Sequence, residues 1–223
     1  GDVMRMLGTQ TELAPQVVDA RAFACACFSR KSVTHDVNQD SCLFVELATD
    51  SLVLAVADGV GGHVDGEKAS RLAVEALSQC LLLETPATSV RGAILDAFDR
   101  ANAAILSLGN NAATTLVVAH VWGEQVHCYH AGDSIAMVTG RRGRRIYETP
   151  AHSVLAQATE LGLLRPHDPA LKEFESMLTN CLGADDMRIE VSAPVALRAF
   201  DTLYVTSDGI TDNLNIGVMA EIN

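Results

Sequence analysis

Small apolar and polar residues alternate in the first part of the chain, as they do in strands that bury one face. This alternation predicts strands over residues 20–28, 41–47 and 51–57, the second of which follows a polar connection. The first 19 residues are a polar N-terminal arm in which no helix or strand is predicted. The chain therefore begins with a group of strands rather than with an alternation of strands and helices.

From Gly66 onward the period changes. Apolar residues recur every three or four positions up to Cys80, which predicts a helix packed on one face. The same stripe returns over residues 90–108 and predicts a second long helix, which Gly109 can close. Both apolar stripes are interpreted as parts of the core.

Strand patterns resume after the two helices, and they continue to the end of the chain without regular strand–helix alternation. Such an order favours antiparallel sheets with helices packed outside them, an α+β fold, over a doubly wound parallel sheet. The predicted strands cover residues 114–121, 125–131, 135–139, 145–147, 187–191 and 202–205, and short helices are predicted near 153–163 and 171–179.

Composition limits the possible classes of protein. A chain of 223 residues with 48% hydrophobic content can bury one sizeable core, so residues 1–223 are expected to form a single domain. The formal net charge of -12 argues against a general binder of nucleic acid or anionic membrane, which needs a basic face. The dense basic run at residues 141–145 is predicted to decorate a hairpin tip.

The cysteines and the hydropathy pattern indicate the compartment. No CxxC or Cys/His finger spacing occurs, and most cysteines lie in apolar runs, so no disulfide framework is expected. No stretch approaches the roughly 20 apolar residues of a membrane span, and the N-terminus lacks a signal-peptide pattern. We therefore expect a cytoplasmic protein in a reducing environment.

Two Asp-Gly pairs carry the clearest chemical signal. Asp58-Gly59 and Asp208-Gly209 each follow an apolar, β-branched run, so each carboxylate is predicted where a buried strand ends. Asp-Gly commonly marks a simple turn. Two copies on hydrophobic strands, with further Asp residues nearby, instead favour a pocket of hard oxygen ligands for Mg²⁺ or Mn²⁺.

Four acidic segments stand in a recognisable order, and together they resemble the metal-dependent type 2C serine/threonine protein phosphatases, in particular bacterial-like members. The resemblance begins near Ala20 and extends to softer features. The four segments are Asn38-Gln39-Asp40, Asp58-Gly59-Val60-Gly61-Gly62-His63, Ala131-Gly132-Asp133-Ser134 and Ser207-Asp208-Gly209-Ile210-Thr211-Asp212; the softer features are Gly66-Glu67-Lys68-Ala69-Ser70, Thr114-Thr115-Leu116, His152-Ser153 and Asp201-Thr202-Leu203.

The resemblance implies a fold and a set of metal ligands. The fold would be a four-layer sandwich of two antiparallel β-sheets flanked by pairs of α-helices, with metals in a cleft at one end. Two ions are implied, with a third in a looser site. Asp58 would bridge the two ions, the Gly59 carbonyl would bind one, Asp208 the other, and Asp40 would bind directly or through water; Asp133 and Asp212 would join Asp208 at the third site.

The implied activity is hydrolysis of phosphoserine and phosphothreonine in proteins. Two divalent ions can clamp phosphate oxygens and lower the pKa of a bridging water for in-line attack on phosphorus. No side-chain nucleophile is then needed, which agrees with the lack of a Cys-x5-Arg loop or a GxSxG motif. The expected partner is a phosphorylated protein, and the expected assembly is a monomer.

Several residues depart from the family pattern. His35 stands five residues before Asp40, where many members carry an Arg that grips the substrate phosphate, and it is the candidate for that role here; a loop histidine with no role stays open. Ile135 replaces the Arg that usually follows Gly-Asp-Ser. Val60 occupies the position of the general-acid histidine of eukaryotic members, and His63 has either a direct or a loop-ordering role.

The C-terminal segment is compressed relative to the family. The family continues through a helix to a final Asp-Asn and a closing strand, whereas Asp212-Asn213 here directly follows the last Asp-Gly motif. The sequence leaves open whether the chain is shortened or Asp212 or Asn213 replaces the terminal Asp. These departures keep a second hypothesis open, a pseudophosphatase that binds phosphoproteins or regulates other proteins.

Overall fold

A computed structural model describes most of the chain. The described residues are 4–7, 13–20, 23–30, 37–48, 50–60, 65–83, 89–163, 174 and 177–211. Within them, every pair of neighbouring strands is antiparallel.

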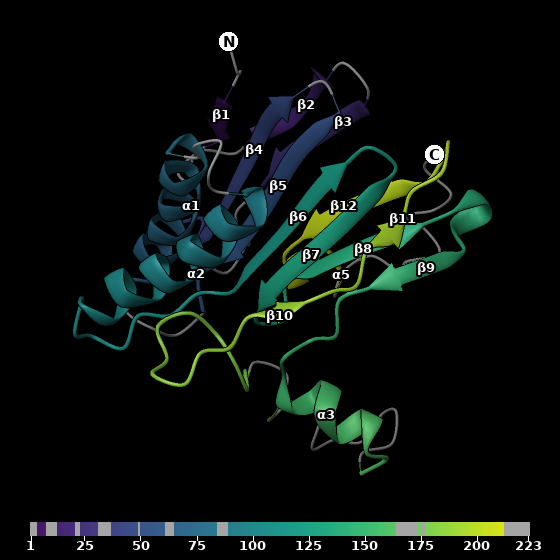
Figure 1. Ribbon diagram of the computed structural model, residues 1–223. Coiled ribbons are helices and arrows are strands. Elements are labelled where there is room, and N and C mark those ends of the chain that lie inside the picture. The colour runs from purple at the N-terminus through teal and green to yellow at the C-terminus, as the bar shows by residue number, and fades with distance from the viewer. Residues whose placement is uncertain are drawn as a thin grey trace.

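The larger sheet forms the centre of the molecule (Figure 1). Its strand order is β1-β4-β5-β6-β7-β10, and β11 also pairs with β7. The strands are β1 Met4–Leu7, β4 Asp40–Ala48, β5 Ser51–Asp58, β6 Leu116–Trp122, β7 Gln125–Ala131, β10 Glu190–Val191 and β11 Val195–Ala196.

Two smaller groups of strands pair among themselves. One is a three-stranded sheet in the order β12-β8-β9, and the other is the β2-β3 hairpin. Side chains of both groups pack with the larger sheet in one shared hydrophobic cluster. The strands are β2 Leu13–Ala20, β3 Phe23–Ser29, β8 Ile135–Thr139, β9 Arg145–Glu148 and β12 Thr202–Thr206.

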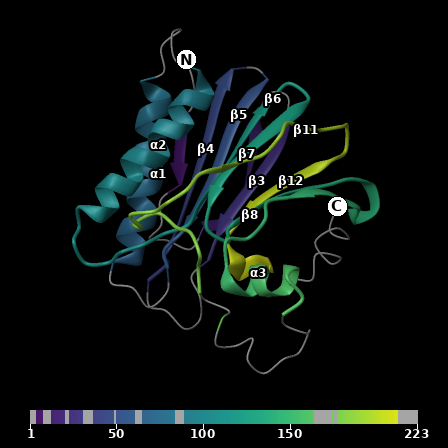
Figure 2. The ribbon, with the colours of Figure 1, turned by 60° about the horizontal axis from the view of Figure 1, so that its bottom comes forward.

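Two long helices cover the other face of the larger sheet, as Figures 1 and 2 show. They are α1 Gly66–Leu82 and α2 Val90–Leu106, and they pack against each other as well as on the sheet. Their apolar stripes are buried, as their three- and four-residue spacing predicts. Among the described residues, the shorter helices are α3 Val154–Glu160 and α5 Asp208–Thr211.

Alternation along β5 explains how the larger sheet buries hydrophobic side chains on both of its faces. Val53 and Ala55 face the helices, whereas Leu52 and Leu54 contact the smaller sheets. Because successive side chains of a strand point to opposite faces, one strand contributes to both layers. The expected α+β fold with two antiparallel sheets and helices is confirmed.

Most predicted elements are present with small shifts. The strands predicted at 125–131 and 135–139 have the predicted bounds, and the basic run at 141–145 does form the β8–β9 hairpin tip, with a 3-10 turn at Arg141–Gly143. The second helix ends at Leu106 rather than 108, although Gly109 does adopt a positive φ of 67°. The strand predicted at 187–191 is shorter, Glu190–Val191.

The N-terminal prediction was wrong in two respects. Residues 1–19 contain strand β1 and most of β2, and Ala20 ends β2 instead of beginning β3. Both strands owe their place to pairing partners, β1 to β4 and β2 to β3, which an alternation count within the segment does not reveal. Most of the helix predicted at 171–179 lies outside the described residues.

Candidate metal centre

Three predicted carboxylates meet at one end of the sheets. Asp40 begins β4 and Asp58 ends β5, and the antiparallel register places these two residues directly opposite each other. A single residue separates the end of β12 from Asp208, which begins α5, and β12 packs across β5 and β6. Strand ends from both sheets thus bring together residues that lie up to 168 positions apart in the sequence.

The three side chains interact directly. The Asp58 carboxyl lies within hydrogen-bonding reach of the carboxyls of Asp40 and Asp208. The Ser207 hydroxyl donates a hydrogen bond to Asp40 Oδ2 at 3.0 Å. This contact ties the end of β12 to the beginning of β4.

Burial and like charge raise the proton affinity of this cluster. Burial is the main cause that raises the pKa of Asp58 to about 10, and the neighbouring charges of Asp40 and Asp208 add to it. Burial also raises the pKa of Asp40. Crowded, buried carboxylates need a proton or a cation to balance their charge. A set of carboxylate oxygens fits hard divalent cations such as Mg²⁺ and Mn²⁺.

The backbone of Asp58 is held by the two residues that precede β6. The Asp58 N–H donates to Thr115 Oγ1 at 2.9 Å, and Thr114 Oγ1 donates to the Asp58 carbonyl at 2.8 Å. The Thr115 N–H also donates to that carbonyl at 2.9 Å. Both threonines are buried. The sequence signalled this pair only as a motif of the resemblance, without a contact to Asp58.

Gly59 has no space for a side chain. A Cβ built there would lie 2.4 Å from both the carbonyl carbon and the oxygen of Gly66, at the start of α1. The Gly59 N–H donates to the Gln39 carbonyl at 3.0 Å. The glycine therefore lets α1 begin directly against the end of β5, beside Asp58.

The Gly132-Asp133-Ser134 turn lies at the same end, between β7 and β8. Gly132 has a φ of 115°, and a Cβ there would meet the Thr115 side chain at 2.6 Å. Ser134 Oγ and Thr115 Oγ1 are hydrogen bonded at 2.6 Å. Asp133 is thereby placed next to the residue that holds Asp58.

Two candidate site residues lie outside the described residues, namely His35 and Asp212, and so does His63. Asp40, Asp58, Gly59, Asp133 and Asp208 are all described. Asp40, Asp58 and Asp208 form one cluster, Gly59 adjoins it, and Asp133 is connected to it through Thr115.

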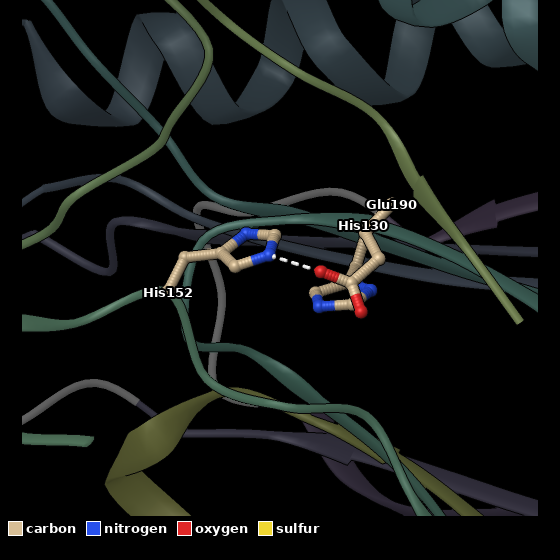
Figure 3. A group of neighbouring side chains, drawn as sticks. All are labelled: His130, His152 and Glu190. Atoms are coloured by element: carbon tan, nitrogen blue, oxygen red, sulfur yellow. Dashed lines mark hydrogen bonds and ion pairs between the residues drawn. The ribbon is translucent and has the colours of Figure 1, made fainter. Parts of the chain in front are cut away.

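The structure brings together a second group of polar side chains that the sequence did not indicate as neighbours. His130, His152 and Glu190 each offer a ligand-type atom, and these atoms lie within 4.8 Å of one another (Figure 3). The register of β10 on β7 pairs Glu190 with His130, and no local pattern in the sequence reveals that pairing. His152-Ser153 was noted only as part of the family pattern.

Strand-end carboxylates that meet in a layered antiparallel fold form the type of site that can bind divalent metal ions. A family model for protein phosphatase 2C matches residues 30–219. The chain belongs to the protein phosphatase 2C family.

A curated relative agrees with this assignment, and two solved structures agree with the fold. The serine/threonine phosphatase Stp of Listeria monocytogenes is 28% identical over 195 residues, which is 83% of this chain and 77% of that protein. The solved S. agalactiae serine/threonine phosphatase has a TM-score of 0.76 at 23% identity, over 99% of this chain and 86% of that one. The catalytic domain of PstP, solved with two manganese ions, has a TM-score of 0.66 at 22% identity, over 99% and 84%.

Proposed function

We propose that this chain is a metal-dependent phosphatase that hydrolyses phosphoserine and phosphothreonine in proteins. The observation that carries the proposal is the contact of Asp58 with Asp40 and Asp208 in a chain of the protein phosphatase 2C family. A similar protein named as a serine/threonine phosphatase, Stp of Listeria monocytogenes, supports the substrate class.

Three carboxylates and one backbone carbonyl are the proposed metal ligands. Asp58, which lies opposite Asp40 and in contact with Asp208, would hold two ions together with the Gly59 carbonyl and Asp208. Asp40 would hold one ion directly or through water, and the Ser207 hydroxyl orients Asp40. When bound, two divalent ions supply charge for the phosphate oxygens and an activated water. Mn²⁺ or Mg²⁺ is the proposed metal.

The remaining candidates serve the substrate or a looser third metal site. His35 is proposed to bind the substrate phosphate, and Asp133 with Asp212 is proposed to complete a third site beside Asp208. The Gly132–Ser134 turn supports this role for Asp133, because its hydrogen bond to Thr115 ties it to the backbone of Asp58.

Turnover of an artificial substrate tests the function. The purified chain should hydrolyse p-nitrophenyl phosphate and a phosphothreonine peptide with Mn²⁺ or Mg²⁺, and EDTA should stop both reactions. Adding excess Mn²⁺ after EDTA should restore them. Equal activity after exhaustive chelation would exclude the metal mechanism, and absence of any turnover with metal would mean a binding module instead.

We also propose that the enzyme acts in the cytoplasm and as a monomer. All six cysteines are free thiols, which fits a reducing compartment. Among the helices of the described residues, none is long and apolar enough to cross a membrane. Light scattering of the purified chain tests the assembly.

A further inference from the structure

His130, His152 and Glu190 come from β7, from the residue before the α3 cap, and from β10. His130 is 2% exposed, His152 is half-buried and Glu190 is exposed. Their spacing would suit a metal ion. The directions of their hydrogen bonds point to a different role.

The environment of His152 selects one tautomer. The Gly132 N–H donates to His152 Nδ1 at 3.2 Å, so this nitrogen must carry the lone pair. Asn180 Nδ2 lies 3.0 Å from the same nitrogen. The Asn180 amide is oriented by the backbone of Arg188, whose N–H donates to Oδ1 and whose carbonyl accepts from Nδ2. Nδ1 therefore faces two N–H donors.

The other ring nitrogen then carries the proton. His152 Nε2 donates to Glu190 Oε2 at 2.9 Å, the contact drawn in Figure 3. A cation bound at Nε2 would require a proton on Nδ1, opposite the two donors. The hydrogen bonds thus disfavour a metal at this group and favour a fixed His152 ring with its proton on Nε2.

His130 supports the ring from one side. Its Nε2 donates to the Pro150 carbonyl at 2.7 Å, and burial lowers its pKa, so it is neutral. The two imidazoles stack with centroids 4.4 Å apart and planes 12° from parallel. This packing limits rotation of the His152 ring.

His152 holds Gly132 at two points. Its backbone N–H donates to the Gly132 carbonyl at 3.0 Å, while its ring accepts the Gly132 N–H. Gly132 packs on Thr115, which also bonds Ser134 and the Asp58 N–H. A continuous set of contacts therefore runs from Glu190 through His152 to the turn that carries Asp133, and on to Asp58.

We propose that His152 is a positioning residue of the phosphatase, which holds the Gly132–Ser134 turn in place, and that Glu190 selects the tautomer that this task requires. The catalytic consequence rests on the proposed function. The hydrogen-bond arrangement itself does not, so the two parts have separate tests.

The first test measures the tautomer without any turnover. Long-range ¹H–¹⁵N correlation spectra of the metal-free chain should show His152 protonated at Nε2, with an unprotonated Nδ1. Addition of Zn²⁺ in the presence of saturating Mg²⁺ should leave the His152 signals unchanged. A proton on Nδ1, or Zn²⁺ binding at this ring, would overturn the proposal even if the enzyme is an active phosphatase.

The second test compares two substitutions of His152 by amide side chains, each of which replaces the hydrogen-bonding function of one ring nitrogen. His152→Asn keeps an acceptor near the Nδ1 position, whereas His152→Gln keeps a donor near Nε2 and loses the acceptor. Loss of a residue that orients metal ligands typically lowers activity 10- to 100-fold. We expect kcat with p-nitrophenyl phosphate and Mn²⁺ to fall about 10-fold or more in His152→Gln, with little change in KM, and substantial recovery in His152→Asn.

Gln157→Ala is the matched control, because it removes an exposed hydrogen bond to Thr179 from the neighbouring helix α3 without touching Gly132. It should retain wild-type kcat. Equal kcat in folded His152→Gln and wild type would overturn the positioning role. An inactive wild type would contradict the proposed function instead, and the tautomer measurement would still decide the hydrogen-bond arrangement.

Discussion

At Asp58, burial and neighbouring charge both oppose ionisation. With its pKa raised to about 10, the folded metal-free protein keeps a proton that the unfolded chain loses above the ordinary value of 3.8. The stabilisation is therefore complete below about pH 4 and is lost as the pH rises toward 10, because the folded state binds more protons. Metal binding reverses the balance by favouring the carboxylate.

Asp58→Asn should remove this pH dependence. In EDTA, wild type should lose stability relative to Asp58→Asn between pH 5 and 9, by up to about 1.4 kcal/mol per pH unit. Urea denaturation at several pH values measures it. The exposed Asp99→Asn should follow wild type. Parallel curves for wild type and Asp58→Asn would show that Asp58 ionises freely in the folded protein.

A second prediction at the residue scale concerns the Thr115 hydroxyl. Thr115→Val keeps the shape of the side chain but removes the acceptor of the Asp58 N–H and the bond to Ser134. A donor left without its partner costs about 1–3 kcal/mol, and we expect this loss in the free energy of unfolding together with lower kcat. Thr159→Val, which loses an exposed bond to Leu155 on α3, should change stability by less than about 0.5 kcal/mol. Equal effects of the two substitutions would contradict the account.

At the scale of elements, the β7–β8 turn depends on Gly132, which packs against Thr115, the residue before β6. Gly132→Ala should destabilise the protein by about 1–3 kcal/mol or more, since its φ of 115° and the contact with Thr115 both exclude a side chain. Gly123→Ala is the control for conformational strain without a packing clash, because Gly123 has a φ of 58° and nothing lies within 4 Å of a Cβ there. Thermal unfolding should show a smaller loss for Gly123→Ala, and the reverse order would exclude a packing role for Gly132.

Elements with a strong local period could be predicted from the sequence. The strands β7 and β8 and the beginnings of α1 and α2 follow from alternation and from the helical stripe. The short strand β11 could not be predicted, because its two residues carry no period and owe their conformation to pairing with β7. The same limit hid the group around His152, since Glu190 reaches His130 only through the register of β10.

At the scale of the whole molecule, the carboxylate cluster could be predicted because Asp-Gly after an apolar strand is a local signal, repeated at Asp58 and Asp208. Its convergence depends on two sheets stacking so that the ends of β5 and β12 coincide, and only the family resemblance implied that arrangement. The support from Thr115, Ser134 and Ser207 was not predicted, because hydroxyl residues at strand ends have many possible partners.

The central claim is that Asp58 and Asp208 hold the metal ions on which phosphate hydrolysis depends. Calorimetric titration of Mn²⁺ into wild type, Asp58→Asn, Asp208→Asn and the control Asp99→Asn, with kcat measured on the same samples, tests it most directly. We predict tight Mn²⁺ binding and turnover in wild type and Asp99→Asn, and the loss of both in the two site variants. Wild-type Mn²⁺ affinity in Asp58→Asn, together with more than about a tenth of wild-type kcat, a loss below 1.4 kcal/mol in the barrier, would contradict the claim.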